Sequence, residues 1–319
     1  GQPATPLFLK PDAAYGIGAA LCWRGLSLGL TDLSGTVLDT HRERYGFPDF
    51  DDVIARIAVA AERFRGQLSE GGKARVAGVG LALPAAMDRC LHALGASGEA
   101  VRHWQNRDFC AELSTAVGLP VWPIGYGAAA AGAQARQGEA GRNEDFAYFF
   151  LGTFLMGGIV LGGSFATARP SGAMLGAMVV PGPDGASRSA DEIVSMRGLE
   201  MALRAAGVDD PGRIDPESDW RAVAGPVEAW LDEAAAALAH VAVNTRCAFE
   251  LDTIVVDGML PGDLLALLIE RTEAAISAVP HAAAGRPVLV QGQLGPRAAM
   301  VGAARLPFHQ RFFNTDATV

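Results

Sequence analysis

The chain is poor in the residues that build disulfide frameworks and metal clusters. Only four of its 319 residues are cysteine and six are histidine. No two cysteines form a CxxC pair, and this spacing argues against both a disulfide framework and a zinc knuckle. Isolated cysteines of this kind are typical of reduced, packed thiols in a cytosolic protein. They are Cys22, Cys90, Cys110 and Cys247.

Runs of basic residues, long apolar segments and a signal sequence are missing as well. The net charge of −9 and the pI of about 5.2 disfavour nonspecific binding to DNA or to an anionic membrane. The most apolar window, residues 148–160, contains glycines and is shorter than the ~20 residues that a membrane-spanning helix needs. We therefore expect a soluble, cytoplasmic protein with no membrane partner.

What the chain does have is enough apolar sequence for two domains. Hydrophobic residues make up 50% of it, which suffices for two separate cores. Residues 1–11 contain three prolines and are typical of an extended connector. We predict a linker or arm over residues 1–13, a first lobe over 14–122 and a second lobe over 123–306. The tail, residues 307–319, is a candidate to return to the first lobe.

The first lobe shows alternating strand and helix patterns. Leucine-rich and β-branched runs separated by glycine predict a hairpin and a third strand over residues 14–43. A 3.6-residue apolar period predicts a helix over 49–68. The remaining predicted elements are a buried strand over 76–83 that ends at Pro84, a helix over 108–117, a strand over 120–122 and a helix from Ala128 onward.

The second half repeats this plan. Its last segment, residues 286–305, matches residues 119–135 in the order proline, valine strand, glycine turn and small-residue helix. Such self-similarity predicts a duplicated α/β architecture, with a ligand cleft between the two lobes. The other predicted elements are a hairpin over 146–165, an alanine-rich helix over 223–249, a strand over 253–260 and a helix over 263–279.

Five segments stand out for their wording and their order along the chain. They are TDLSGTVLDT (31–40), GVGLALPAAMD (78–88), HWQNRDFCAELSTAVGLPV (103–121), LGTFLMGGIVLGG (151–163) and QGQLGPRAAMVGAARLPFHQRFF (291–313). Together they resemble the ROK family, which groups bacterial sugar kinases with sugar-responsive transcriptional repressors. The resemblance covers essentially the whole chain and implies the actin-like ATPase (ribonuclease H-like) fold. The opening PLFLKPDAAYGIG is also similar to the junction that follows the winged-helix domain of the family's repressors.

The resemblance implies a first hairpin that holds the phosphates of ATP, and this chain departs from it. In ROK kinases the hairpin reads Asp, any residue, Gly, Gly, Thr, because glycines let backbone amides approach phosphate. Here Ala20 replaces the acid, and Trp23 and Arg24 lie where small residues are expected. We expect the Trp23 indole to occupy the space that a phosphate would need.

The second phosphate hairpin is better preserved. Gly152, Thr153 and Gly157 are retained, but bulky residues replace the small, glycine-rich tip. A tight turn that needs glycine for backbone reasons alone explains the retained residues equally well.

The catalytic base that the resemblance implies is also missing. ROK kinases use the aspartate of a Glu-Asn-Asp turn to accept the proton of the sugar hydroxyl. The matching positions here are Ile124, Gly125 and Tyr126. Tyrosine, with an unperturbed pKa near ~10, is a poor base at neutral pH. Tyr126 could contact a ligand, stack on a sugar or simply pack at the helix start.

A third family motif supplies a sugar-binding glutamate and a histidine that serves sugar and zinc. Met174 and Ala177 occupy these positions here. The cysteines that complete the zinc site are absent from residues 183–192, so we expect no metal. Either Asp191 or Glu192 could correspond to the last sugar-binding acid.

The rest of the implied sugar pocket is a loop and part of a helix in the first lobe. Its candidates are Pro84, Ala85, Asp88, Trp104 and Asn106. A strand end followed by a turn or helix cap is an alternative explanation of the loop.

These departures lead to the expectation that the chain is not an enzyme. We expect a non-catalytic, sugar-sensing and dimerisation domain of a ROK-type transcriptional regulator that uses no cofactor. Its expected partners are a small carbohydrate effector and a second copy of the chain, and DNA would be bound only through a winged-helix domain outside this chain. Two alternatives stay open: an active sugar kinase with a divergent site, and a scaffold that binds no ligand.

Overall fold

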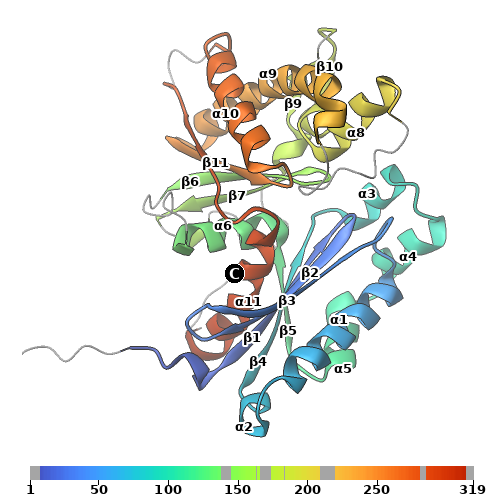
Figure 1. The fold of residues 1–319 in the computed structure, drawn as a ribbon, viewed down its shortest axis with the longest axis vertical. Coiled ribbons are helices and arrows are strands. Elements are labelled where there is room, and N and C mark those ends of the chain that lie inside the picture. The colour runs from blue at the N-terminus through green and yellow to red at the C-terminus, as the bar shows by residue number, and fades with distance from the viewer. Residues whose placement is uncertain are drawn as a thin grey trace, which may run out of the picture. The chain divides into compact units, whose positions relative to one another are not determined.

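A computed structural model describes residues 8–137, 145–162, 164–165, 174–182, 184–208, 220–280 and 285–313. The chain divides into two compact units (Figure 1). Unit 1 contains residues 1–124 and 300–319, and unit 2 contains residues 125–299. The chain therefore passes between the units twice, and both of its ends belong to unit 1.

Unit 1 is built on a five-stranded mixed sheet with the order β3-β2-β1-β4-β5. β1 pairs antiparallel with β2, and β2 with β3, while β1 pairs parallel with β4. The central strand β4 is buried along nearly its whole length. Its near-continuous apolar sequence is typical of a strand that is covered on both faces. The strands are β1 (Tyr15–Cys22), β2 (Gly25–Asp32), β3 (Val37–Arg44), β4 (Val76–Leu83) and β5 (Val121–Gly125).

Helices α1 and α5 cover one face of this sheet (Figure 1). α1 begins after Asp49, whose side chain accepts a hydrogen bond from the Asp52 amide, and it buries Val53, Ile57 and Phe64. These apolar side chains recur every three or four residues, so they form one face. The helical segments before residue 120 are η1 (Pro11–Ala13), α1 (Phe50–Gly66), α2 (Glu70–Lys73), α3 (Met87–Ala93), α4 (Gly98–Asn106) and α5 (Phe109–Val117).

The last helix, α11 (Ala298–Phe308), packs on glycines of the unit 1 sheet. A methyl group added at Gly18 would lie 2.2 Å from the Met300 carbonyl oxygen, and one at Gly80 would lie 1.8 Å from that of Ala303. Since no side chain fits in these gaps, glycine is what allows the helix to approach the sheet. η7 (His309–Phe313) continues the chain after α11.

Unit 2 contains a sheet of the same topology, with the order β12-β11-β6-β7-β8. β6 pairs antiparallel with β7 and parallel with β11, and β11 pairs parallel with β12. β6, β7, β8, β11 and β12 thus correspond in order to β1 to β5 of unit 1. The strands are β6 (Phe146–Leu151), β7 (Leu155–Leu161), β8 (Ser164–Phe165), β11 (Thr253–Gly258) and β12 (Val288–Gln291), and a separate ribbon pairs β9 (Val179–Pro181) with β10 (Ser187–Ser189).

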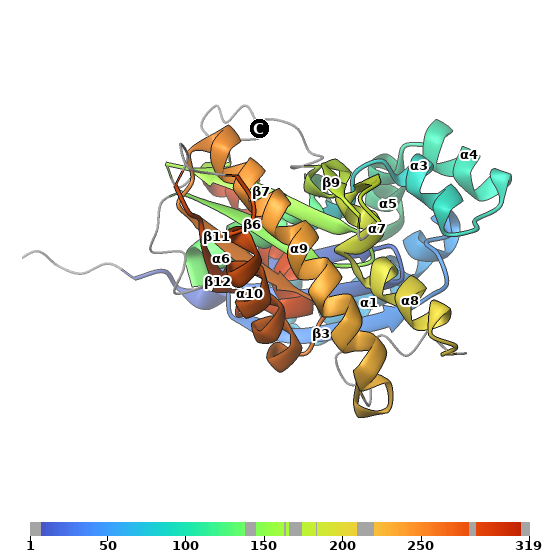
Figure 2. The same ribbon diagram turned by 90° about the horizontal axis from the view of Figure 1, so that it is seen from above.

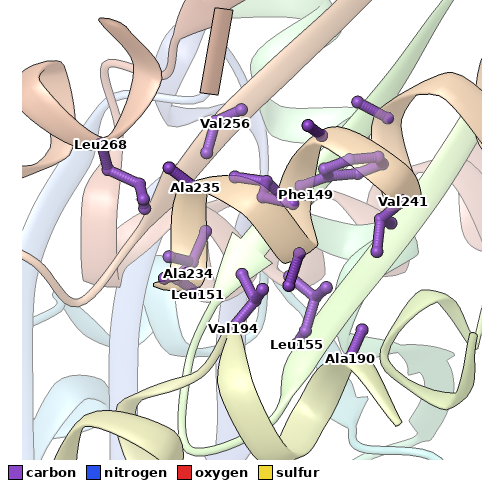
Figure 3. Close-up of a cluster of buried hydrophobic side chains, with 14 of the residues drawn as sticks. Phe149, Leu151, Leu155, Ala190, Val194, Ala234, Ala235, Val241, Val256 and Leu268 are labelled. Carbon is purple, nitrogen blue, oxygen red and sulfur yellow. The ribbon is translucent and has the colours of Figure 1, made fainter. Parts of the chain in front are cut away.

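Helices α9 and α10 lie side by side in unit 2 (Figure 2). Their apolar faces join the sheet in a core that includes Phe149, Val256 and Leu268 (Figure 3). α6 packs on β6 and β7. The helical segments are α6 (Tyr126–Gln137), η3 (Leu175–Ala177), α7 (Ala190–Ile193), α8 (Met196–Ala205), η5 (Trp220–Val223), α9 (Ala224–Phe249), α10 (Gly262–Ile276) and η6 (Gly295–Arg297).

The structure confirms the predicted duplicated α/β fold. It adds helices that the sequence analysis did not predict, among them α3, α4 and α8. It also assigns α11 from Met300 onward to unit 1. None of the helices in the described ranges combines the length and apolarity needed to cross a membrane.

Candidate functional site

The first candidate phosphate turn joins β1 to β2 in unit 1. Ala20 and Trp23 are each 1% exposed, so the indole lies within the protein interior, while Arg24 is half-buried. The hydroxyl of Tyr45 lies 2.6 Å from the Cys22 carbonyl oxygen and 2.7 Å from that of Gly25. Because this hydroxyl bridges the two ends of the turn, it holds the turn closed.

The other unit 1 candidates lie beyond the end of β4. Pro84 is buried, Ala85 is half-buried, and Ala86 adopts a left-handed φ of 55° that is unfavourable for a residue with a side chain. Asp88 lies in the first turn of α3. Sparsely populated backbone conformations occur frequently in functional loops, so this loop remains a candidate for ligand binding.

Trp104 and Asn106 lie on α4 in different settings. The Trp104 ring stacks on Phe109 with their centroids 4.7 Å apart, and its indole N–H donates to the Pro48 carbonyl oxygen at 2.9 Å. Asn106 is exposed. Trp104 is therefore engaged in packing between α4 and the start of α1 and α5.

In unit 2, α6 begins directly at the end of β5. Gly125 is the last residue of the strand and Tyr126 the first of the helix, so no loop separates them. The Tyr126 side chain is 4% exposed and its ring lies 5.2 Å from that of Phe150. The Tyr126 phenol, which the sequence analysis aligned with the family's base, is thus held against β6.

The glycines of the β6–β7 hairpin have packing roles. A methyl group at Gly157 would lie 2.2 Å from Leu175 Cδ1, and one at Gly158 would lie 2.7 Å from the Gly127 carbonyl oxygen. Gly152 and Thr153 at the hairpin tip are buried. These close contacts give the retained glycines a structural reason that requires no nucleotide.

The segment that carries Met174 and Ala177 lies against this hairpin. Both residues are exposed, Met174 at 53%. Between them, Gly176 approaches the Asp191 carboxyl so closely that an added methyl group would lie 2.1 Å from its Oδ1 atom. The structure therefore brings the hairpin tip, residues 174–178 and Asp191 together within unit 2.

Asp191 and Glu192, which the sequence leaves as alternatives, differ sharply in the structure. Asp191 is half-buried at the start of α7, and its Oδ1 atom accepts a hydrogen bond from the Leu155 amide at 2.5 Å. Burial raises the pKa of the Asp191 carboxyl to about 6, against the lowering effects of this hydrogen bond and of Arg197. Glu192 is exposed. A carboxyl whose pKa is raised by burial in this way is typical of functional sites.

The most deeply buried carboxyl of the described residues, that of Asp257, was missed by the sequence analysis. Asp257 is 1% exposed at the end of β11 and accepts hydrogen bonds from the Tyr148 hydroxyl at 2.8 Å and the Gly295 amide at 3.0 Å. Burial raises the pKa of Asp257 and keeps that of Tyr148 well above its usual value. An acid within the apolar strand TIVVDG was the signal that could have revealed it.

Among the described residues, no three His, Cys, Asp or Glu side chains gather closely enough to hold a metal ion. The carboxyl of Asp191 is a group that can accept hydrogen bonds.

Comparison with known proteins shows both kinases and a regulator. The chain is 20% identical to a ROK-family glucokinase from Streptomyces griseus, solved in complex with glucose and AMPPNP, with a TM-score of 0.71 over 92% of this chain and 99% of that one. It is 20% identical to a ROK-family transcriptional regulator, a homolog of the E. coli MLC protein, with a TM-score of 0.64 over 93% of this chain and 78% of that one.

A sequence relative is the bifunctional enzyme NanE/NanK of Brucella melitensis, 31% identical over 203 residues. The match covers 61% of this chain and 36% of the relative, so the chain spans little more than a third of that enzyme.

These comparisons contradict the expectation that the chain is not an enzyme. The glucokinase shares the fold across nearly the whole chain, and NanE/NanK is an enzyme by name. The earlier expectation rested on the loss of individual side chains.

The sequence profile of the ROK family matches residues 24–310, which include the whole unit 2 sheet, strands β2 to β5 of unit 1, the hairpin tip and Asp191. The chain therefore belongs to the ROK family.

Proposed function

We propose that the chain is a ROK sugar kinase with a divergent site, which transfers phosphate from ATP to a hexose or an N-acetylated hexosamine. The proposal is supported by its likeness to the glucokinase solved with glucose and AMPPNP and by its sequence similarity to NanE/NanK.

The observation that carries the proposal is the setting of Asp191. Its Oδ1 atom accepts a hydrogen bond from the Leu155 amide, and within the described residues the carboxyl makes no other hydrogen bond. A carboxylate oxygen in this position can accept a hydrogen bond from a sugar hydroxyl. The neighbouring hairpin tip, with Gly152 and Thr153, is the backbone segment proposed to face the phosphates.

Tyr126 makes the proposed kinase slow. General base catalysis typically contributes about 10²–10⁴-fold in rate, and a phenol at the position of the family's aspartate supplies little of it at neutral pH. Positioning of the two substrates would account for the remaining acceleration.

Thermal shift and product analysis test the proposal. Glucose, mannose and N-acetylmannosamine are each added with and without Mg²⁺ and ATP, and the release of ADP is measured. A sugar that raises the melting temperature in a dose-dependent manner and stimulates ADP release supports the proposal. Failure of every sugar and of the nucleotide to bind contradicts it and favours a scaffold.

A second candidate function is the sugar-responsive part of a transcriptional regulator. The regulator structure favours it, because this chain aligns with 78% of that protein and leaves the rest for another domain. The proposed partners are a carbohydrate effector, a second copy of the chain and, through a separate winged-helix domain, DNA. A sugar-dependent change in dimerisation, measured by analytical ultracentrifugation, would support this function.

A further inference from the structure

Gln134 on α6 is a buried polar residue whose hydrogen-bonding groups are unmet. Its side chain is 0% exposed, and neither the amide oxygen nor the amide nitrogen has a hydrogen-bond partner within the described part of the chain. An amide that leaves water without gaining a partner loses the hydrogen bonds that it made there, so this group opposes its own burial. Such groups are rare in native proteins, and each is a local source of strain.

The Gln134 side chain lies on the face of α6 that contacts β7. Gly127, Ala131 and Gln134 follow one another at intervals of four and three residues, so they share one face of the helix. A methyl group added at Gly127 would lie 2.0 Å from the Gly157 carbonyl oxygen, and one added at Gly158 would lie 2.8 Å from the Ala131 Cβ atom. The amide is therefore directed at the sheet rather than at solvent.

The part of the sheet that follows Gly158 on this side is apolar. Side chains alternate along a strand, so Val160 projects from the same face as Gly158, and so does its cross-strand partner Phe146 on β6. The two side chains are 2% and 0% exposed. Neither valine nor phenylalanine can hydrogen-bond an amide through its side chain, which is consistent with the unmet groups of Gln134.

The last turn of α6 is held less firmly than the start of the helix. Residues 126–131 are all buried, and the Tyr126 ring packs on Phe150. Ala135 is half-buried and Arg136 is exposed, so the helix reaches solvent within two residues of Gln134. The final carbonyl groups of a helix also lack intrahelical partners. The part of α6 that separates most easily from the sheet thus carries the unmet amide.

We infer that residues 134–137 form a strap that opens away from β7 and closes again, and that the Gln134 amide drives the opening. In the open form the amide regains hydrogen bonds with water, whereas Phe146 and Val160 become accessible. The regained hydrogen bonds favour the open form and the apolar contacts favour the closed form, so the two effects offset each other. The inference concerns only α6 and its sheet, and it does not depend on the proposed function.

Hydrogen exchange read residue by residue by NMR tests the strap. Gln134→Met keeps the length of the side chain and a good helix former but removes the amide, so it should favour the closed form. We expect the backbone amides of residues 134–137 to exchange at least about tenfold more slowly in this variant, the factor that corresponds to relief of one unmet hydrogen-bonding group. Exchange in the first two turns of α6 should not change.

Thiol labelling provides a second measurement, because the open strap uncovers β7. In a Val160→Cys protein, a thiol reagent should modify position 160 whenever the strap is open, and mass spectrometry identifies the labelled position. Adding Gln134→Met to this protein should slow the labelling by the same factor as the exchange.

Thr245→Val is the matched control for both measurements. Thr245 on α9 is also 0% exposed, and its hydroxyl has no partner in the described residues. The substitution removes an unmet polar group from another helix, so it should leave the exchange of residues 134–137 at the wild-type rate. Gln134→Leu is a second apolar variant, in case methionine fits poorly.

Slowing of both the exchange and the labelling by Gln134→Met supports the inference. Slowing of only one of them, or of neither, overturns it, and so does an equal slowing by Thr245→Val. If Gln134→Met and Gln134→Leu both fail to fold or both unfold at lower urea concentrations, the amide is hydrogen-bonded in solution and the inference is wrong.

Discussion

At the scale of single residues, unit 2 contains two carboxyls that burial affects in different ways. Asp257 is enclosed by donors from β6, β11 and the turn after β12, so its hydrogen bonds are made within the protein. Asp191 accepts one hydrogen bond, from the Leu155 amide, within the described residues. The first arrangement satisfies the carboxyl within the fold, and the second is the one on which the proposed ligand site rests.

The raised pKa of Asp191 predicts a specific pH dependence of stability. Because the folded-state pKa of about 6 exceeds the usual aspartate value of 3.8, this group stabilises the fold below about pH 4. The contribution is lost as the pH rises through 6 and amounts to at most about 3 kcal/mol. Asp191→Asn removes it, so the unfolding free energy of the variant minus that of the wild type should increase from pH 4.5 to 7.5.

Urea denaturation at both pH values provides the measurement, and Glu192→Gln serves as the control for a nearby exposed charge. A difference that stays constant across this range would show that Asp191 titrates near its ordinary pKa in the folded protein.

Glu250 offers a prediction about backbone conformation. It caps the end of α9 with a left-handed φ of 54°, which glycine adopts without strain. Glu250→Gly should therefore raise the unfolding free energy by about 1 kcal/mol. The same substitution at Glu270, an exposed residue within α10, should lower it by about 1 kcal/mol. Chemical denaturation of the two variants compares them, and destabilisation by Glu250→Gly would contradict the expectation.

At the scale of elements, the two sheets pack against a helix in the same way. Each lies against a helix rich in small residues, α11 in unit 1 and α6 in unit 2, at glycines that admit the helix backbone. The proline, valine strand and glycine turn before each helix predict this correspondence from sequence. The short helices α3, α4 and α8 were not predicted, although the similarly short α5 was.

Substitution of the glycines at these helix–sheet contacts should lower the free energy of unfolding. At Gly127 an added methyl group would lie 2.0 Å from the Gly157 carbonyl oxygen, and at Gly80 the clash with Ala303 is closer still. Gly80→Ala and Gly127→Ala should each lower the unfolding free energy by about 1–3 kcal/mol or more. Gly66→Ala is the control, since nothing lies within 4 Å of its added methyl group and helix propensity favours alanine. Equal effects at all three positions, measured by thermal unfolding, would disprove the close approach.

At the scale of the whole molecule, unit 2 is continuous in sequence whereas unit 1 depends on the chain's return at residue 300. The return supplies the helix that covers Gly16, Gly18 and Gly80. A fragment of residues 1–124 should therefore lack a cooperative thermal transition. The same fragment joined by a flexible linker to residues 300–319 should regain one, as followed by circular dichroism. Cooperative unfolding of the shorter fragment with the same midpoint would show that α11 is dispensable.

The sequence by itself determined the duplicated α/β plan and the family, because apolar periodicity and glycine turns are local properties of the chain. It also located Gly152, Thr153 and Gly157 on one hairpin and Tyr126 at a helix start. Only the tertiary structure distinguished Asp191 from Glu192 and revealed the pairing of Asp257 with Tyr148, since burial and hydrogen bonding depend on residues distant in sequence. The role of an acidic residue depends on its surroundings, because desolvation and nearby hydrogen-bond donors set its pKa and determine whether its oxygens can accept further hydrogen bonds.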